Sequence, residues 1–269
     1  MRMSLTDFPL IMGILNVTPD SFSDGGQFQQ QDIALHHAEQ MLRQGAHIID
    51  IGGESTRPDS QPVSVQQELN RVIPIIEAIK AELPVKVSID TSKAEVMQAA
   101  IKAGADMIND VAALRYGNSV QTAAQANVPV CLMHMQGEPK TMQHSPEYND
   151  VVTEVKQFLL QRVKVCLDQG IAAHNIWIDM GFGFGKTLEH NLQLMNHLEQ
   201  FTQLGYPVLV GVSRKSMIGR VLDKSVDQRL FGGLGLTALA ISKGAKIIRT
   251  HDVAATKDVV TMVQAVMNS

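Results

Sequence analysis

Short apolar runs bounded by turn-forming residues recur along the whole chain. Each run is about as long as a buried strand and is nearly continuous in apolar residues, which is typical of a parallel sheet covered on its outer face. The runs read PLIMGILN, HIIDIG, VKVSID, DMINDV, PVCLMH, NIWIDMG, PVLVGV and KIIRTH. The pattern therefore predicts eight strands spread over the chain.

The segments between these runs have helical spacing, for example residues 33–46, 65–82, 93–105 and 151–170. Several of them end at a glycine that precedes the next strand, the usual stop signal of a helix. No Pro-rich or Ser-rich linker divides the chain, so alternating strands and helices predict one α/β domain over residues 1–269, a single (β/α)8 TIM barrel. A doubly wound open sheet is the alternative, but it gathers its ligand residues at one switch point.

Polar residues instead close nearly every predicted strand. In chain order they are Asn16, Asp50, Asp90, Asn109, His134, Asp179, Ser213, and Arg249 with His251. In a (β/α)8 barrel these positions converge on the carboxyl-end face, where the active sites of this fold lie. A single terminal Asp or Asn often only caps a helix or a turn. The whole set indicates a polar heterocycle bound by directional hydrogen bonds.

Composition excludes several classes of function. The 269 residues are 45% apolar and can bury a large core, and the net charge of -4 gives no basic excess for nucleic acid or anionic membranes. The two cysteines, Cys131 and Cys166, lie in apolar surroundings and favour a reducing compartment over a disulfide framework. The N-terminal segment has no apolar signal region, and no apolar run reaches about 18 residues, so we expect a cytoplasmic protein.

Two segments after predicted strands have residues suited to a ring or a carboxylate. GFGFGKT at 181–187 lacks the spacing of a Walker loop and of a dinucleotide fold, and it is interpreted as a flexible loop that offers Phe184 to a ligand. VGVSRKSMIG at 210–219 opens a short helix. Its free N–H groups, with Ser213 and Lys215, could receive a carboxylate or a ring carbonyl.

Two further segments supply cations for an oxyanion. RTHDV places Arg249 and His251 on the same face of a strand, which suits a group such as pyrophosphate. IDIGGESTRP provides Arg57 after two glycines that permit a sharp turn. The spacing of His and Cys does not favour a zinc cage. Mg²⁺ held by an amide oxygen and substrate phosphates is compatible with the sequence, because this ion commonly keeps few protein ligands.

Together these motifs closely resemble the dihydropteroate synthase family of the pterin-binding barrel superfamily. The matching motifs are GILNVTPDSFSDGG, GAHIIDIGGESTRP, VSIDT, GADMINDV, CLMHMQG, DMGFGFGKT, VGVSRKSMIG and RTHDV. They occur in the family's order over nearly the whole chain. One departure is Met180, where the family commonly has proline, and it removes no functional group.

The resemblance implies a transferase of folate biosynthesis that is a target of sulfonamides. It would join 6-hydroxymethyl-7,8-dihydropterin pyrophosphate to 4-aminobenzoate, giving 7,8-dihydropteroate and pyrophosphate. A dissociative reaction is implied, in which pyrophosphate leaves first and the aniline nitrogen captures a pterin cation. The resemblance further implies Mg²⁺ as cofactor and a homodimer.

The resemblance also assigns residues to each ligand. Pterin would be bound by Asp90, Asn109, Met133, Asp179 and Lys215. Pyrophosphate would be bound by Asn16, Arg57, Arg249 and His251, with Asn16 also contacting Mg²⁺. Aminobenzoate would be bound by Phe22, Thr56, Pro58, Phe184, Ser213 and Lys215. The residues expected to act in catalysis are Asn16, Asp90, Lys215 and Arg249, with the Asp90 carboxylate stabilising the cation.

The segment NVTPDSFSDGG at 16–26 is expected to fold over the barrel mouth and bring Phe22 against aminobenzoate. Two rival functions have to be weighed. A methyltetrahydrofolate-dependent methyltransferase shares the pterin-binding barrel, but it does not need this segment, the STRP segment or the RTH segment. A non-catalytic barrel that serves as a partner subunit would be expected to lose site residues, and this sequence keeps them.

Overall fold

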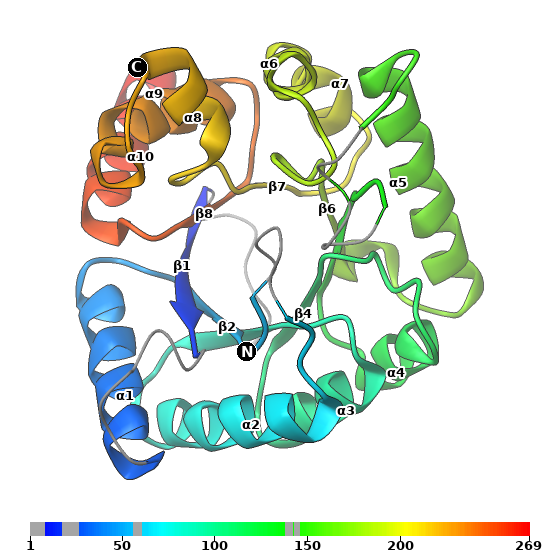
Figure 1. Ribbon diagram of the computed structural model, residues 1–269, viewed down its shortest axis with the longest axis vertical. Helices are drawn as coiled ribbons and strands as arrows, with labels where there is room; N and C mark the ends of the chain where they lie inside the picture. Colours follow the sequence, from blue (N-terminus) through cyan, green and yellow to red (C-terminus); the bar gives the residue numbers. More distant parts are fainter. Residues whose placement is uncertain (1–8, 18–26, 56–60, 138–141, 143–145) are drawn as a thin grey trace.

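Eight parallel strands form a closed barrel in the computed structural model, which describes residues 9–17, 27–55, 61–137, 142 and 146–269. The strands follow chain order around the barrel, and β1 pairs with β8 to close it (Figure 1). Their bounds are β1 Leu10–Asn16, β2 Ile48–Gly52, β3 Lys86–Asp90, β4 Met107–Asp110, β5 Val130–Met133, β6 Ile176–Asp179, β7 Val208–Val210 and β8 Ile247–Thr250. The predicted (β/α)8 barrel is confirmed, and the open sheet is excluded.

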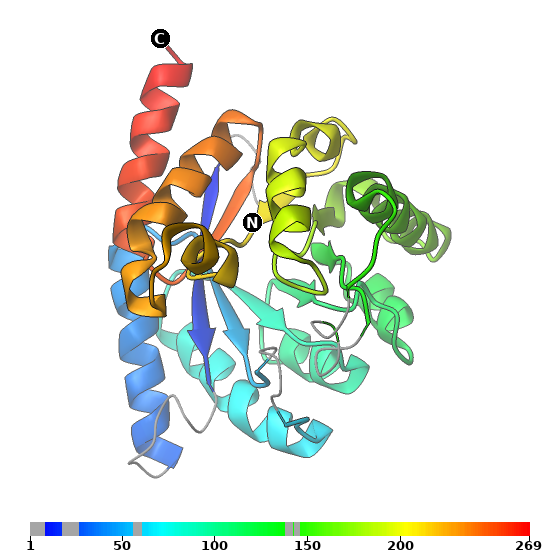
Figure 2. The same cartoon turned by 45° about the horizontal axis from the view of Figure 1, so that its top comes forward.

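Helices surround the strands, as both views of the ribbon show (Figure 1, Figure 2). Their bounds are α1 Gln27–Arg43, α2 Val65–Glu82, α3 Ala94–Lys102, α4 Ser119–Ala126, α5 Val151–Asp168, α6 Leu188–Asn196, α7 Glu199–Thr202, α8 Ser216–Leu222, α9 Leu230–Ser242 and α10 Val253–Met267. The predicted helix over 65–82 has the observed bounds of α2. A capping box of Ser64 and Gln67 fixes where this helix begins.

Glycines end several helices before the next strand, as the sequence predicts. Gly104 follows α3 with φ +107°, and Gly244 follows α9 with φ +93°. Side chains rarely adopt these values, so glycine lets the chain turn sharply from helix to strand. At these two positions the chain therefore passes from helix to strand with little intervening loop.

The strands bury two distinct layers inside the barrel. An apolar cluster crosses the interior and consists of Leu10, Met12, Ile48, Met107, Cys131, Trp177, Leu209 and Ile247. Because side chains alternate along a strand, the next inward residue lies two positions further toward the carboxyl end. Those next residues are polar on four strands: Asp50, Asn109, Asp179 and Arg249. The barrel thus has an apolar floor beneath a polar layer.

One boundary differs from the expectation. Asp50 was expected at the end of its strand, but it lies in the middle of β2, which continues to Gly52. The ladder continues because Gly52 still pairs with Asn16 of β1 and Asp90 of β3. Asp50 is therefore enclosed within the barrel and is fully buried.

Both cysteines, Cys131 and Cys166, are free and buried. Of the helices in the described parts of the chain, none combines the length and the apolar character needed to cross a membrane.

Candidate active site

Asp50 connects three strands in the polar layer. Its Oδ2 accepts a hydrogen bond from Nε of Arg249 at 2.6 Å and one from Nδ2 of Asn109 at 3.0 Å. Arg249 also donates from a terminal nitrogen to Oδ2 of Asp90 at 2.7 Å. Strands β2, β3, β4 and β8 therefore bring two carboxylates, an amide and a guanidinium together. The sequence singled out Asp50 as a polar strand residue but gave it no role in the site.

Two carboxylates share one guanidinium in this cluster. Burial raises the pKa of Asp90 to about 7, although Arg249 lowers it, and the nearby Asp50 adds to the rise. Burial also acts on Arg249, but Asp50 and Asp90 outweigh it and hold the pKa of Arg249 above its usual value. Oδ1 of Asp50 has no hydrogen-bond partner among the described residues. A ligand that donates an N–H hydrogen bond to this oxygen would remove the free-energy cost of leaving it buried and unpaired.

Asp179, Lys215 and Phe184 line the other side of the mouth. Oδ1 of Asp179 accepts a hydrogen bond of 2.7 Å from the backbone N–H of Gly181, and Nζ of Lys215 lies 4.1 Å from the centroid of the Phe184 ring. Burial lowers the pKa of Lys215 to about 8, and Arg249 lowers it further, while Asp179 opposes both. The ammonium can therefore lose its proton near physiological pH.

The glycine-rich loop before α6 is held by a buried lysine. Nζ of Lys186 donates to the carbonyl oxygens of Gly181 and Phe184, both at 2.9 Å, and lies 3.0 Å from Nδ1 of His134. Burial, together with Lys186, lowers the pKa of His134 to about 2, so the imidazole is neutral and can accept a hydrogen bond from Nζ of Lys186. The loop follows β6 as the sequence predicts, and the offering of Phe184 to a ligand stays a prediction. No role was predicted for Lys186 from the sequence.

The glycines of this loop are required by close backbone contacts. A Cβ on Gly181 would lie 2.0 Å from the carbonyl oxygen of His134, and a Cβ on Gly185 would lie 2.5 Å from that of Gln136. Oδ1 of Asn191 accepts a hydrogen bond from Gly183 N–H at 2.7 Å. The sequence suggested a flexible loop, whereas the structure shows a loop whose backbone is held at several points.

Ser213 and His251 form a pair on the rim of the mouth. The Ser213 hydroxyl lies 3.0 Å from Nδ1 of His251 and accepts a hydrogen bond from the His251 backbone N–H at 3.2 Å. Burial lowers the pKa of His251 to about 4, and Arg214 and Arg249 contribute. The imidazole is therefore neutral at pH 7 and would contact an anion as a hydrogen-bond donor, with Arg249 supplying the charge.

Asn16 ends β1 beside Asp90. Oδ1 of Asn16 and Oδ2 of Asp90 each lie 3.8 Å from the place that a Cβ on Gly52 would take. Within the described ranges, the Asn16 side chain makes no hydrogen bond, and no group of three or more His, Cys, Asp or Glu residues could hold a metal. An amide oxygen is a suitable ligand for Mg²⁺, which usually keeps several ligands from water and phosphate. The residues present therefore fit a Mg²⁺ ion that is held mainly by phosphate oxygens of the enzyme's substrate.

An apolar wall completes the described part of the site. Met133 and Phe184 pack with Val111, Met135 and Met142 in one buried cluster. The side chain of Met180 is buried in the layer between strands and helices, outside the barrel interior. The family's usual proline could be replaced there without changing the lining of the site.

Ten of the predicted site residues meet at the carboxyl ends of the strands. They are Asn16, Asp90, Asn109, Met133, Asp179, Phe184, Ser213, Lys215, Arg249 and His251. Four others lie outside the described residues, and their assignments stay predictions. They are Phe22, Thr56, Arg57 and Pro58.

The fold and the site define a barrel enzyme that binds a flat, polar heterocycle next to an anion. The family described as "Pterin binding enzyme" matches residues 12–251. The dihydropteroate synthase of Haemophilus influenzae is 55% identical over 261 residues, which cover 97% of this chain and 95% of that protein.

Solved structures agree with this comparison. A sulfonamide drug complex of the Yersinia pestis dihydropteroate synthase has a TM-score of 0.94 at 48% identity, covering 99% of this chain and 97% of that one. The Xanthomonas albilineans enzyme with 4-aminobenzoic acid has a TM-score of 0.92 at 47% identity, covering 98% and 94%. The chain belongs to the pterin-binding enzyme family and, within it, to the dihydropteroate synthases.

Proposed function

We propose that the chain condenses 6-hydroxymethyl-7,8-dihydropterin pyrophosphate with 4-aminobenzoate, giving 7,8-dihydropteroate and pyrophosphate. The observation that carries this proposal is the inward ring of Asp90, Asn109, Asp179 and Lys215 above an apolar floor. The amine and ring N–H donors of a pterin suit the Asp179 carboxylate, while its carbonyl and ring nitrogen suit Lys215 and the Asn109 amide. These four side chains therefore match the donors and acceptors of a pterin.

The pyrophosphate is assigned to the rim beside the pterin. Arg249 supplies a guanidinium whose bonds to Asp50 and Asp90 leave further N–H groups for phosphate oxygens. His251 would donate from its neutral ring, and Arg57 remains a predicted partner. Asn16 would hold Mg²⁺, which when bound supplies positive charge that stabilises the departing pyrophosphate.

Asp90 is proposed to stabilise the reacting carbon. Loss of pyrophosphate leaves a cation at the exocyclic carbon of the pterin, and delocalisation into the dihydropterin ring makes it accessible. A fixed carboxylate beside the ring favours that charge more than it favours the neutral substrate. The aniline nitrogen is a weak nucleophile, so forming the electrophile first removes the need for a strong general base.

The aminobenzoate pocket is proposed to lie between the Phe184 ring and the rim. Nζ of Lys215 lies over the Phe184 ring, 4.1 Å from its centroid, and this cation–π contact helps to orient the ring. Ser213 is close to the start of α8 and offers a hydroxyl. Phe22, Thr56 and Pro58, which lie outside the described residues, remain predicted partners.

The direct test is pyrophosphate release by the full chain with Mg²⁺ and both substrates. We expect release that depends on 4-aminobenzoate, together with formation of 7,8-dihydropteroate. Omitting 4-aminobenzoate is the control for slow hydrolysis of the pterin substrate. No release with both substrates and Mg²⁺ present would overturn the proposed function.

We also propose that the protein forms a homodimer through α8, α9 and α10. These helices lie together beside β8 (Figure 1). They carry exposed apolar side chains. Phe231 is 77% exposed, Val266 69% and Met262 64%. A large exposed apolar patch is typical of an interaction surface. Light scattering should give twice the mass of the chain, and Phe231→Asp should shift it toward the monomer. A monomeric wild-type protein would contradict the proposal.

A further inference from the structure

Two adjacent side-chain pairs join β7 to β8 beyond the point where their backbone pairing stops. The backbone ladder ends at Val210 of β7. Beyond it, the Ser213 hydroxyl lies 3.0 Å from Nδ1 of His251. Next to this pair, Nη2 of Arg214 donates to Oδ1 of Asp252 at 2.6 Å, and Nε donates to Oδ2 at 3.3 Å. Both pairs span 38 residues, the same offset as in the ladder, so they extend its register to the rim of the mouth.

The backbone of Arg214 has a conformation that costs free energy. Its φ is +59°, in the left-handed region, at the third position of a turn in which the Lys215 N–H donates to the carbonyl oxygen of Val212 at 3.2 Å. Glycine or asparagine is usual at such a position, because a side chain is crowded there. Nη1 of Arg229 donates to the carbonyl oxygen of Arg214 at 3.1 Å. The turn is therefore held by the contacts that Arg214 makes and not by its local preference.

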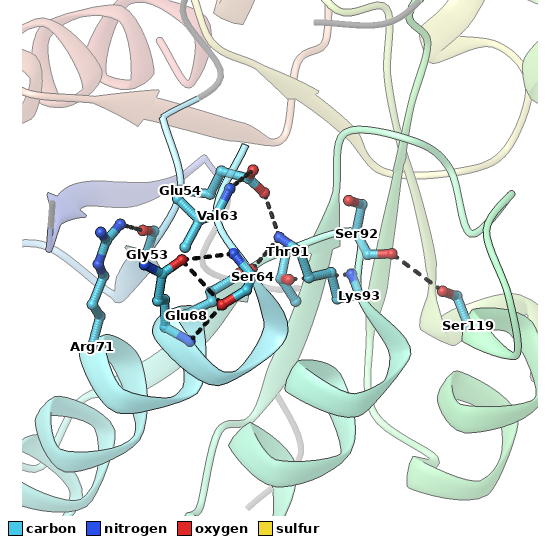
Figure 3. Close-up of polar contacts among 11 residues, drawn as sticks. Gly53, Glu54, Val63, Ser64, Glu68, Arg71, Thr91, Ser92, Lys93 and Ser119 are labelled. Atoms are coloured by element: carbon cyan, nitrogen blue, oxygen red, sulfur yellow. Dashed lines mark hydrogen bonds and ion pairs between the residues drawn. The ribbon is translucent and has the colours of Figure 1, made fainter. Parts of the chain in front are cut away.

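Asp252 gives up the contact that an aspartate at the start of a helix usually makes. An N-cap side chain commonly accepts hydrogen bonds from the first backbone N–H groups of its helix. Ser64 does so at α2, where it accepts from the Gln67 N–H at 3.3 Å (Figure 3), and Asp150 does so at α5. Asp252 is the N-cap of α10, but its side chain accepts from none of the described N–H groups of that helix and binds Arg214 instead.

Stability alone does not account for this ion pair. The Arg214 side chain is 46% exposed, and exposed ion pairs contribute little to the free energy of unfolding. The two residues nevertheless accept a strained backbone and an uncapped helix. What the pair does provide is a fixed geometry, because two contacts between a guanidinium and a carboxylate set their relative orientation.

The neighbouring pair determines which nitrogen of the His251 ring carries the proton. The Ser213 oxygen accepts a hydrogen bond from the backbone N–H of His251 at 3.2 Å, so the hydroxyl proton can be donated to Nδ1 of the ring at 3.0 Å. A neutral imidazole whose Nδ1 accepts a hydrogen bond carries its proton on Nε2. Nε2 is then the ring nitrogen that can donate to an anion.

We infer that Arg214 is a positioning residue for pyrophosphate, acting through Asp252 to keep His251 beside Ser213 and in the tautomer that donates from Nε2. The inference rests on the proposed function, in which His251 binds pyrophosphate. Arg214 itself does not contact the anion, because its guanidinium is engaged by Asp252. The pair acts by holding the ends of β7 and β8 in register where their backbones no longer pair.

The residues proposed for the pterin depend on other contacts. Asn109 donates to Asp50, and the Asp179 carboxylate accepts from the Gly181 N–H. The Lys215 ammonium lies over an aromatic ring of the loop before α6. The ion pair therefore affects the leaving group without setting the affinity for the pterin.

The test separates the leaving group from the ring. In Arg214→Met we expect the KM for 6-hydroxymethyl-7,8-dihydropterin pyrophosphate to rise about tenfold, as loss of one hydrogen bond to a charged group would cause. Affinity for 6-hydroxymethyl-7,8-dihydropterin, which has no pyrophosphate, should change by less than about twofold when measured by calorimetry. Arg214→Lys should recover only part of the KM, because an ammonium cannot reproduce both contacts to Asp252.

Asp252→Asn shows whether Arg214 acts through Asp252 or touches the anion. If it acts through Asp252, this variant should raise the same KM, and the double variant should be no worse than Arg214→Met alone. If Arg214 contacted pyrophosphate directly, loss of the competing carboxylate would leave the KM unchanged or lower it, and that result would overturn the inference. Asp252→Asn also keeps the test available in case Arg214→Met does not fold.

The His251 ring gives a readout that general destabilisation would not change. Nitrogen NMR shifts distinguish its tautomers, and we expect the Nε2–H form in the wild type and a mixture in Arg214→Met. Arg214 lowers the pKa of His251 and Asp252 raises it, so the two variants should shift this pKa in opposite directions. Arg249 and Lys215 also lower this pKa and are unchanged in both variants. A KM that rises in both variants therefore reflects position and not charge.

Arg43→Met is the matched control. Nη2 of Arg43 donates to Oε1 of Glu39 in an exposed ion pair at the end of α1, before β2 and away from the mouth. Its removal should leave both the KM and the His251 tautomer unchanged. The inference is overturned if Arg214→Met loses affinity equally for the pterin with and without pyrophosphate, or if it keeps the wild-type tautomer. Failure of the proposed function is a separate result, because it would appear as no pyrophosphate release by the wild-type protein.

Discussion

Nε of Arg249 donates a 2.6 Å hydrogen bond to the carboxylate of Asp50, which is fully buried inside the barrel. The same oxygen of Asp50 accepts from Asn109, so one carboxylate orients a residue proposed for pyrophosphate and one proposed for pterin. Oδ2 of Asp50 therefore contacts a residue of each proposed binding site, the one for pyrophosphate and the one for the pterin. A displacement of Asp50 would disturb both at once.

Asp90→Asn should lower kcat by about a hundredfold or more, because removing a charge aimed at the transition state has effects of that order. Pterin affinity should fall much less, since the amide can still form hydrogen bonds. Pyrophosphate release measures kcat, and calorimetry measures the affinity for the pterin. Asp106→Asn, at the opposite end of the barrel, is the control. Turnover close to that of the wild type would contradict the role of Asp90.

The pH dependence of kcat/KM for the pterin substrate should show a rise through about 7, where Asp90 of the free enzyme loses its proton. Asp50 raises this pKa and Arg249 lowers it. Asp50→Asn should therefore shift the midpoint to lower pH, and Arg249→Gln should shift it to higher pH. Shifts in the same direction in both variants would exclude Asp90 as the titrating group.

The same group should affect stability in a defined direction. Asp90 binds its proton more tightly in the folded chain than in the unfolded chain, where its pKa is about 4. Its contribution to the free energy of unfolding therefore falls as pH rises from about 4 to about 7 and is constant above that range. Urea denaturation over this range should show that the free energy of unfolding of the wild type falls with pH relative to that of Asp90→Asn. A difference independent of pH would contradict the raised pKa.

Pterin affinity should weaken as pH rises through about 8, where Lys215 loses its proton. The neutral amine is a poorer donor to the pterin carbonyl than the ammonium is. Calorimetry over this range should show the change in the wild type, and Lys215→Met should bind weakly with no such dependence. If Lys215→Met keeps the dependence, another group is responsible.

Lys186→Met should lower the free energy of unfolding by about 2–4 kcal/mol, because it leaves buried carbonyl oxygens and His134 without their donor. Urea denaturation measures the loss. Lys164→Met provides the comparison, since the exposed pair with Asp168 should be worth less than about 0.5 kcal/mol. Equal losses in the two variants would show that Lys186 does not hold the loop.

The sequence predicted the strands and the closed barrel because apolar runs and glycine stops are local signals. It predicted the bounds of α2 from the helical spacing of residues 65–82, and in the structure the capping box of Ser64 and Gln67 marks the same start. It misplaced Asp50, since the double glycine that follows resembles a turn while Gly52 still pairs on both sides. Strand pairing is a property of neighbours that are distant in the chain.

The buried ion networks could not be predicted from the sequence. Lys93 meets Glu54 and Glu68 across 39 and 25 residues, and Lys186 meets His134 across 52. Nothing in the local pattern distinguishes these lysines from solvated ones. The neutral state of His251 likewise follows from its burial beside two arginines, which only the folded chain shows.

The apolar floor of the barrel limits how a chemist can enlarge a compound that mimics the pterin. Trp177 and Met12 are almost completely buried there, and they belong to one packed cluster with Ile48 and Leu209. A substituent directed downward would have to displace packed side chains, and overfilling a core costs free energy. A compound that mimics the pterin would therefore have to be extended sideways or outward, toward Phe184 and Lys215, where the substitution of one side chain could abolish its binding.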